Sequence, residues 1–250
     1  MSFEIFSTGS SLLHRLDVRA KLLSALALIL TLALSRTFPP PLAGLAAGVL
    51  LVAIAGLDWR SVMKRLLLVN GFVLFLWFTL PLSYPGTPLF SIGPVPLSRD
   101  GVLLAALITI KTNGSVLILM ALVATSTVAD LGNGLARLKL PESLSMLILF
   151  SYRYIFVIHQ EYSRLLRAAR LRGFKAATTF HTYRTFGYLF GMTLIKSHHR
   201  AERVRQAMIL RGFDGRFHSL NSSTIGMKEI GFSIVVALLT GAMISFELTR

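Results

Sequence analysis

Apolar residues gather in five long runs along this chain instead of alternating with polar ones. The runs cover residues 22–35, 42–57, 66–84, 101–129 and 230–246. A membrane-spanning helix needs about 20 mostly apolar residues, within a range of about 17–25. The third and fourth runs meet this length outright, and the other three reach it with their flanks. A core helix of a soluble protein explains any single run, but five of them predict an all-α integral membrane bundle of about five transmembrane helices.

The composition supports a membrane protein and argues against a soluble single-domain enzyme. Of the 250 residues, 54% are hydrophobic and only 15% are charged, whereas soluble domains are about 25% charged. The runs lack the alternating pattern of a transmembrane barrel. The chain has no cysteine, which excludes disulfides, iron–sulfur clusters and thiolate zinc sites. The chain has 26 Lys and Arg against 11 Asp and Glu. The positions of the cations therefore help to predict the orientation in the membrane.

Cation-rich and cation-poor connections alternate along the chain. The N-terminal segment, the loop 58–65 and the part from residue 130 onward are rich in Lys and Arg, whereas 36–41 and 85–100 hold one arginine each. The positive-inside rule therefore predicts a cytoplasmic N-terminus and a cytoplasmic segment after residue 130. The Pro- and Gly-rich stretch 84–96 is then expected outside, as a non-helical loop. No small-residue cleavage site follows the first run, so we expect it to be retained as a helix.

The predicted organisation has three parts. Residues 1–129 hold transmembrane helices 1–4, residues 130–228 form a cytoplasmic or interfacial domain, and residues 229–250 form the last transmembrane helix. The middle part is basic, because residues 159–228 hold 13 of the 26 cations and only three acids. The apolar run 144–158 ends at this basic block, so we expect it to lie at the membrane interface or under the bundle. Alternatively, it crosses the membrane as a pair with residues 186–195.

Two basic segments, 142–172 and 186–211, are predicted to be helices with the same ending. Each closes with Leu-Arg-Gly-Phe, and Gly173 and Gly212 suit the left-handed position that follows a helix. In the second segment, Arg200, Val204, Met208 and Arg211 share one face. Cations at helix ends also favour the helix dipole or anionic lipid headgroups. The sharper hypothesis is a docking surface for an acidic groove on a cytoplasmic partner, since arginine binds carboxylates with two parallel bonds.

Catalytic and cofactor signals are missing from the sequence. It has no phosphate-binding G-x-x-x-x-G-K-[ST] loop and no H-E-x-x-H motif, so we expect no catalytic residue, cofactor or metal site in this chain. The aromatics of the basic block form no recognisable stacking module, which argues against a nucleic-acid partner. Lys111 lies inside the fourth run and is either functional or paired within the bundle. Asn70 and Asn113 are expected to hydrogen-bond between helices.

The N-terminal residues resemble a known family. Residues 13–23 read LHRLDVRAKLL, similar to the N-terminal signature of the T components of energy-coupling factor (ECF) transporters, with Val18 where that family usually has proline. The two Arg-Gly endings resemble the Ala-Arg-Gly-type motifs that close the family's coupling helices, although leucine precedes each arginine here. Tyr152-Arg153-Tyr154 followed by Glu161 resembles the cobalt and nickel subgroup, the CbiQ/NikQ-like proteins. The matching residues of the N-terminal motif are His14, Arg15, Asp17, Arg19 and Lys21.

The resemblance implies a non-catalytic scaffold in the bacterial cytoplasmic (inner) membrane. Such a scaffold joins a dimer of ATP-binding cassette ATPases to a membrane substrate-binding, CbiM-like subunit, and ATP is hydrolysed in the partner chains. The cargo implied is cobalt or nickel ions, with a vitamin importer as the alternative within the family. A stand-alone secondary carrier or membrane enzyme is the alternative of another class, with Lys111 as its one midplane charge. The ATPase-coupling residues implied are Arg170, Arg172, Gly173, Met208, Arg211 and Gly212.

Overall fold

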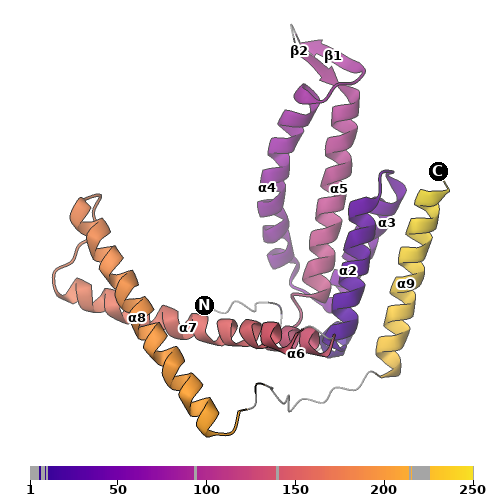
Figure 1. Cartoon of the computed structure of the whole chain (residues 1–250). Coiled ribbons are helices and arrows are strands. Elements are labelled where there is room, and N and C mark those ends of the chain that lie inside the picture. The colour runs from indigo at the N-terminus through magenta and orange to yellow at the C-terminus, as the bar shows by residue number, and fades with distance from the viewer. Residues whose placement is uncertain are drawn as a thin grey trace. The chain divides into compact units, whose positions relative to one another are not determined.

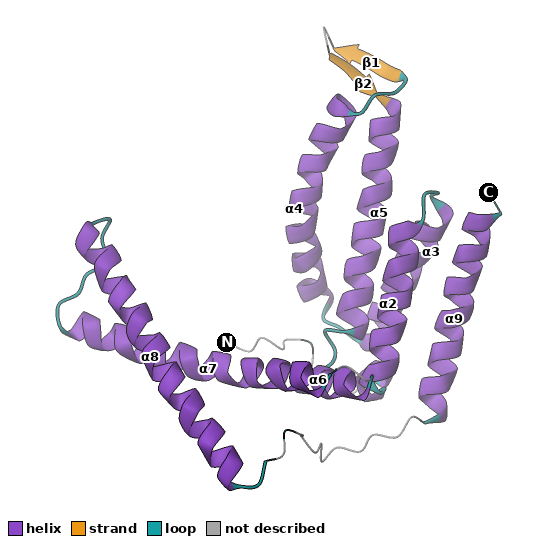
Figure 2. Cartoon of the chain, in the orientation of Figure 1, coloured by secondary structure: helices purple, strands orange, loops and turns teal. Residues whose placement is uncertain are grey.

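The computed structural model of the chain describes residues 6, 9, 11–92, 95–138, 141–213, 215 and 226–249. These residues are mainly helical, with one small hairpin (Figures 1 and 2). The chain divides into two compact units, which we call the bundle unit (Met1–Gly134 with Ser222–Arg250) and the crossed-helix unit (Leu135–Asn221). The elements are α1 Leu12–Arg15, α2 Val18–Leu34, α3 Pro39–Ala55, α4 Trp59–Ser83, β1 Pro88–Ile92, β2 Val95–Ser98, α5 Arg99–Leu122, α6 Val128–Arg137, α7 Glu142–Leu171, α8 Phe180–Leu210 and α9 Met227–Leu248.

Helix α5 is the centre of the bundle unit. It packs against α2, α3 and α4, and α9 packs against α2 and α3 (Figure 1). The core includes Leu28, Leu32 and Ile118, which are fully buried. Helices α3 and α5 approach each other closely at Gly48. A Cβ atom at this position would lie only 2.9 Å from the Cβ atom of Leu117. Small residues at such contacts are typical of helices that associate within a membrane.

The five apolar runs all form helices, which confirms the predicted all-α membrane bundle. Helices α4, α5 and α9 are long and apolar enough to cross a bilayer, and α3 is a shorter apolar helix of 17 residues. Helix α2 also has 17 residues, at the lower limit of about 17 for a span. The fourth run, 101–129, contains most of α5, which ends at Leu122; a turn closed by the bond from the N–H of Ser126 to the carbonyl of Val123 follows.

The connection between α4 and α5 contains a short hairpin. We expected a non-helical loop over residues 84–96, and there β1 and β2 pair as an antiparallel hairpin at the ends of α4 and α5 (Figure 2). A two-stranded hairpin is only marginally stable alone. Here its base is held by a bond from the backbone N–H of Thr87 to the carboxylate of Asp100 at 3.3 Å.

The crossed-helix unit consists chiefly of α7 and α8, of 30 and 31 residues. The two helices cross obliquely, and their C-terminal ends point in different directions (Figure 1). Helix α7 follows the predicted range closely, but α8 begins six residues before the predicted start at 186. Its N-cap is Thr179, whose hydroxyl accepts a bond from the backbone N–H of Thr182. The sequence pattern missed this turn because Phe180, Tyr183 and Arg184 are all exposed and show no apolar face.

Candidate docking site on the crossed helices

The ends of α7 and α8 have the same backbone geometry. Arg172 is the last helix-like residue of α7 (φ −87°, ψ 14°), and Gly173 follows with φ 88°. The N–H of Gly173 donates to the carbonyl of Arg170 at 3.0 Å, and the N–H of Phe174 donates to the carbonyl of Ala169 at 3.1 Å. These two bonds define a Schellman ending, which satisfies carbonyls that the helix leaves free.

The second ending repeats these features bond for bond. Arg211 has φ −91° and ψ 11°, and Gly212 has φ 79°. The N–H of Gly212 donates to the carbonyl of Ile209 at 3.0 Å, and the N–H of Phe213 donates to the carbonyl of Met208 at 3.1 Å. A Cβ atom at Gly173 or Gly212 would meet nothing within 4 Å. Glycine is therefore required at both places by the left-handed backbone and not by a lack of space.

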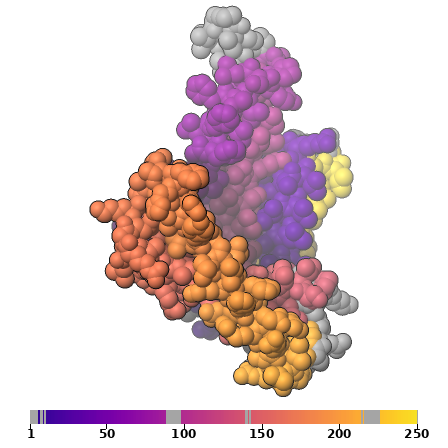
Figure 3. All heavy atoms as spheres, turned by 60° about the vertical axis from the view of Figure 1, so that its left-hand side comes forward, coloured from indigo at the N-terminus to yellow at the C-terminus, as the bar shows by residue number. Residues whose placement is uncertain are grey.

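Each ending carries an uncovered leucine beside its arginine. Leu171 is 90% exposed and Leu210 is 88% exposed, and Arg170, Arg172 and Arg211 are exposed as well. We call these two segments, residues 171–174 and 210–213, the tips. Figure 3 shows α8 as an uncovered orange ridge that runs to its tip. The sequence analysis named the arginines and glycines but missed the leucines, whose repeated place before Arg-Gly was the available signal.

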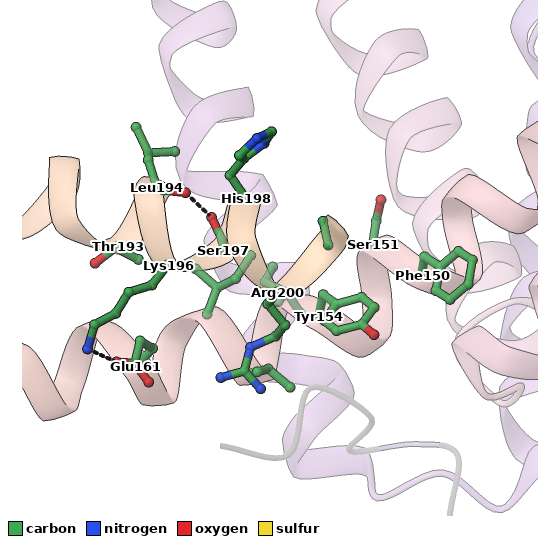
Figure 4. A pocket seen from close by; sticks show the side chains of 14 residues that line it. Phe150, Ser151, Tyr154, Glu161, Thr193, Leu194, Lys196, Ser197, His198 and Arg200 are labelled. Atoms are coloured by element: carbon green, nitrogen blue, oxygen red, sulfur yellow. Dashed lines mark hydrogen bonds and ion pairs between the residues drawn. The ribbon is translucent and has the colours of Figure 1, made fainter. Parts of the chain in front are cut away.

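An ion pair and two aromatic contacts hold α7 and α8 together. The ammonium of Lys196 on α8 donates to the carboxylate of Glu161 on α7 at 2.6 Å (Figure 4). This hydrogen bond is the main reason why the pKa of Glu161 lies below its ordinary value. The rings of Tyr162 and Phe190 stack with centroids 5.2 Å apart. Phe174, in the α7 tip, meets Phe186 edge-on at 5.6 Å, so the first tip is fixed to the start of α8.

A largely apolar groove of about 760 Å³ follows this crossing. Phe150, Tyr154 and Ile158 line it from α7, and Leu194 and Ala201 line it from α8. Figure 4 shows Tyr154 and Phe150 along one wall, with Lys196 and Arg200 at the other. Exposed apolar area of this kind is typical of interaction surfaces. The sequence analysis did not predict this groove, since it expected 144–158 at the membrane interface or under the bundle, or crossing the membrane as a pair with 186–195.

The N-terminal motif lies in the bundle unit, where most of its side chains have internal partners. Lys21 is 1% exposed, and its ammonium donates to the hydroxyl of Ser126 at 3.0 Å. Asp17 caps α2 by accepting the backbone N–H of Arg19 at 2.8 Å. His14 lies 2.6 Å from the hydroxyl of Ser11 and 2.9 Å from the carbonyl of Phe6, and Arg15 is exposed. The motif therefore stabilises the α1–α2 corner and ties α2 to the turn after α5.

Other polar residues in the bundle unit also have partners. Asn70 and Asn113 exchange two amide hydrogen bonds, at 2.9 and 3.0 Å, which confirms the predicted interhelical contact. The ammonium of Lys111 donates to the carbonyls of Ala33 and Ser35. Lys111 thus covers the carbonyl end of α2, as expected for a cation paired within the bundle. Within the ranges that the structure describes, no three His, Cys, Asp or Glu side chains come together as a metal site.

Comparison with known proteins identifies relatives over most of the chain. A family model described as CbiQ, cobalt transport protein, matches residues 9–221. The energy-coupling factor transporter transmembrane protein EcfT of Bacillus subtilis is 25% identical over 96% of this chain and 95% of its own length. The cobalt transport protein CbiQ of Rhodobacter capsulatus is 27% identical over 54% of this chain and 55% of its own length. The nickel permease LarQ of Lactiplantibacillus plantarum is 34% identical over 37% of this chain and 33% of its own length.

Proposed function

The chain belongs to the CbiQ family of cobalt transport proteins, which are T components of energy-coupling factor transporters, and we propose that it joins two cytoplasmic ATPases to a membrane substrate-binding subunit. As a member of this family it is a multi-pass membrane transport subunit. ATP hydrolysis occurs in partner ATPases and not in this chain. The alternative of a stand-alone carrier or membrane enzyme therefore has no support.

The observation that carries the proposal is the pair of matching tips. Two long helices end in the same sequence, the same capping bonds and the same exposed Leu-Arg pair. Two equal tips suit two equal partners, as in an ATPase dimer. Arg172 and Arg211 would each bind carboxylates or carbonyls on one ATPase with parallel bonds, and Leu171 and Leu210 would fill an apolar pocket beside them.

The crossing supports a role in transmitting movement. A helix tip bound to an ATPase moves when ATP closes the dimer, and a helix transmits this displacement only if its contacts hold. The Glu161–Lys196 pair and the Tyr162–Phe190 stack join α7 and α8 at the crossing. Packed interfaces of this kind switch between discrete arrangements instead of bending gradually. The groove beside the crossing would then contact the substrate-binding subunit through apolar side chains.

The proposed orientation follows the cations. The N-terminal segment and the crossed-helix unit would lie in the cytoplasm of a bacterial cell, and the β1–β2 hairpin would lie outside. The proposed domains are the predicted ones: helices in 1–129, the coupling domain in 130–228 and the last helix in 229–250. Lys139 and Arg216 lie outside the described part of the chain, so their support for this orientation comes from the sequence alone.

We propose cobalt or nickel ions as the cargo, bound by the partner subunit. The family description and the names of the Rhodobacter capsulatus and Lactiplantibacillus plantarum relatives support these metals. The alternative within the family is a vitamin importer, and the name of EcfT of Bacillus subtilis, which aligns over more of the chain, specifies no metal. Uptake of radiolabelled nickel or cobalt by cells that express the complete set of subunits distinguishes the two.

The docking role is tested by co-purification. The double variant Arg172→Ala with Arg211→Ala should insert into the membrane normally but lose the ATPases, since each interfacial arginine contributes about 2–5 kcal/mol. Leu171→Ser with Leu210→Ser should weaken ATPase binding roughly tenfold per tip, because each leucine loses its apolar contact. The matched control is Arg203→Ala, an exposed cation of α8 away from the tips, which should retain the ATPases. Wild-type ATPase retention in the arginine double variant would refute the docking role.

A further inference from the structure

A second groove of about 760 Å³ lies within the bundle unit, on a different set of helices. Its lining includes Leu68 and Val69 of α4, Val116 and Met120 of α5, and Leu131 of α6. Leu68 is 80% exposed, so the groove is open along α4. Because α4 and α5 are both long and apolar enough to cross a bilayer, the occupant of this groove has to be stable in hydrocarbon.

Two adjacent cations lie at the edge of this groove. Lys64 and Arg65 of α4 are part of the lining and are exposed. No lining residue is acidic, and within the described residues no carboxylate forms an ion pair with either cation. Among the described residues, the charge of both cations is therefore left for an anion from outside the chain. The groove therefore combines positive charge with apolar side chains in one lining, which suits an anion that carries an apolar chain.

The guanidinium of Arg65 lies over an aromatic ring. Its central carbon lies 4.6 Å from the centroid of the Phe6 ring, and Phe6 is buried. A guanidinium that stacks on a ring keeps its N–H groups free at its edge, where they match two oxygens of a phosphate. Lys64, which precedes Arg65 directly in α4, adds a second donor and a second positive charge.

We propose that this groove binds one anionic phospholipid. The phosphate lies against Lys64 and Arg65, and an acyl chain lies along Leu68, Val116 and Met120. A free phosphate would satisfy the cations but leave the apolar walls uncovered, and a zwitterionic lipid would cover the walls but carry no net charge for the cations. Basic pockets between membrane helices bind anionic headgroups by the same physics. The binding site is separate from the tips and from the groove of the crossed-helix unit.

The test measures lipid retained by the full chain purified with its partner subunits in mild detergent. Native mass spectrometry with added phosphatidylglycerol should show one tightly retained lipid, which phosphatidylcholine and inorganic phosphate do not displace. Lys64→Gln with Arg65→Gln should weaken phosphatidylglycerol binding about thirtyfold, from the loss of two cations. Ala124→Phe, which places a ring in the groove, should abolish retention. Arg60→Gln, one turn earlier on α4 and outside the lining, is the matched control.

Three results would overturn the proposal. One is equal retention of phosphatidylcholine by the wild-type complex, and another is retention of phosphatidylglycerol by the charge variant at wild-type strength. The third is a loss in Arg60→Gln as large as in the charge variant, which would indicate general attraction to the surface. The comparison of phosphatidylcholine with phosphatidylglycerol uses only the wild-type complex, so it tests the proposal even if a variant fails to fold.

Discussion

The carboxylate of Glu161 on α7 accepts a hydrogen bond of 2.6 Å from the ammonium of Lys196 on α8. The two residues lie 35 positions apart in the chain and meet where the helices cross. Arg164, one turn further along α7, approaches the same carboxylate at 3.5 Å. Glu161 is thus a carboxylate among cations. Among the described residues, it forms the one ion pair that joins α7 to α8.

This ion pair makes the crossing sensitive to acid. The hydrogen bond from Lys196 lowers the pKa of Glu161 below its model-peptide value of 4.5, so the native state binds the proton less tightly than the unfolded chain. The stabilisation that this ion pair gives the folded protein is therefore complete above about pH 5. It is lost as the pH falls through the lowered pKa of Glu161. Glu161→Gln should be less stable than the wild type at pH 7, and the difference should shrink as the pH falls towards 3. Thermal unfolding of the purified protein across this range measures it, and a gap that grows in acid would contradict the assignment.

Lys21 should matter more for stability than any other cation of the N-terminal motif. Lys21→Ala removes the donor to the buried hydroxyl of Ser126 and leaves a cavity, which should cost about 2–4 kcal/mol. The matched control is Arg15→Ala in the same motif, where the side chain is exposed and the change should stay within about 0.5 kcal/mol. Thermal unfolding in detergent compares them. Equal effects of the two substitutions would show that the buried bond is not what stabilises this corner.

The left-handed glycines of the tips should tolerate asparagine better than valine. At Gly173 and Gly212 the backbone has φ of 88° and 79°, a region that asparagine enters at small cost and a β-branched residue avoids. Gly173→Val should cost about 1–2 kcal/mol and weaken ATPase retention, whereas Gly173→Asn should change both little. Gly187→Ala, within α8 and with nothing within 4 Å of the new Cβ, should instead stabilise the helix by about 0.5–1 kcal/mol. Equal tolerance of valine and asparagine would argue against a need for the left-handed backbone.

The orientation in the membrane gives a further prediction. The chain has no cysteine, so a single introduced cysteine reports its own position. Ser91→Cys, in β1, should react with an impermeant thiol reagent added to intact cells, and Ser219→Cys should react only after the cells are opened. Ser219 lies outside the residues that the structure describes, so this expectation rests on the basic sequence around it. The reverse labelling pattern would invert the proposed topology.

Much of the fold follows from local sequence signals. A run of apolar residues longer than about 17 is stable as a helix in hydrocarbon whatever its neighbours are, and so the runs predicted all five apolar helices. Glycine after a basic helix predicted both Schellman endings, since the left-handed position depends on a single residue. Interhelical hydrogen bonds of Asn70 and Asn113 could be expected from the sequence because an amide in an apolar helix needs a partner, and the structure shows that they bond to each other. The strands β1 and β2 were not predicted, because they are only five and four residues long, and the start of α8 was placed late because its first turn shows no apolar face.

The sequence by itself determined the class of protein and the positions of the tips, because both depend on short stretches of neighbouring residues. Only the tertiary structure decided what depends on residues far apart in the chain. It paired Lys21 with Ser126, 105 positions away, and it left Leu171 and Leu210 uncovered while burying other leucines. It also formed one groove at the crossing and another beside Lys64 and Arg65. Burial and distance arise from the packing of whole helices, which no local pattern of residues contains.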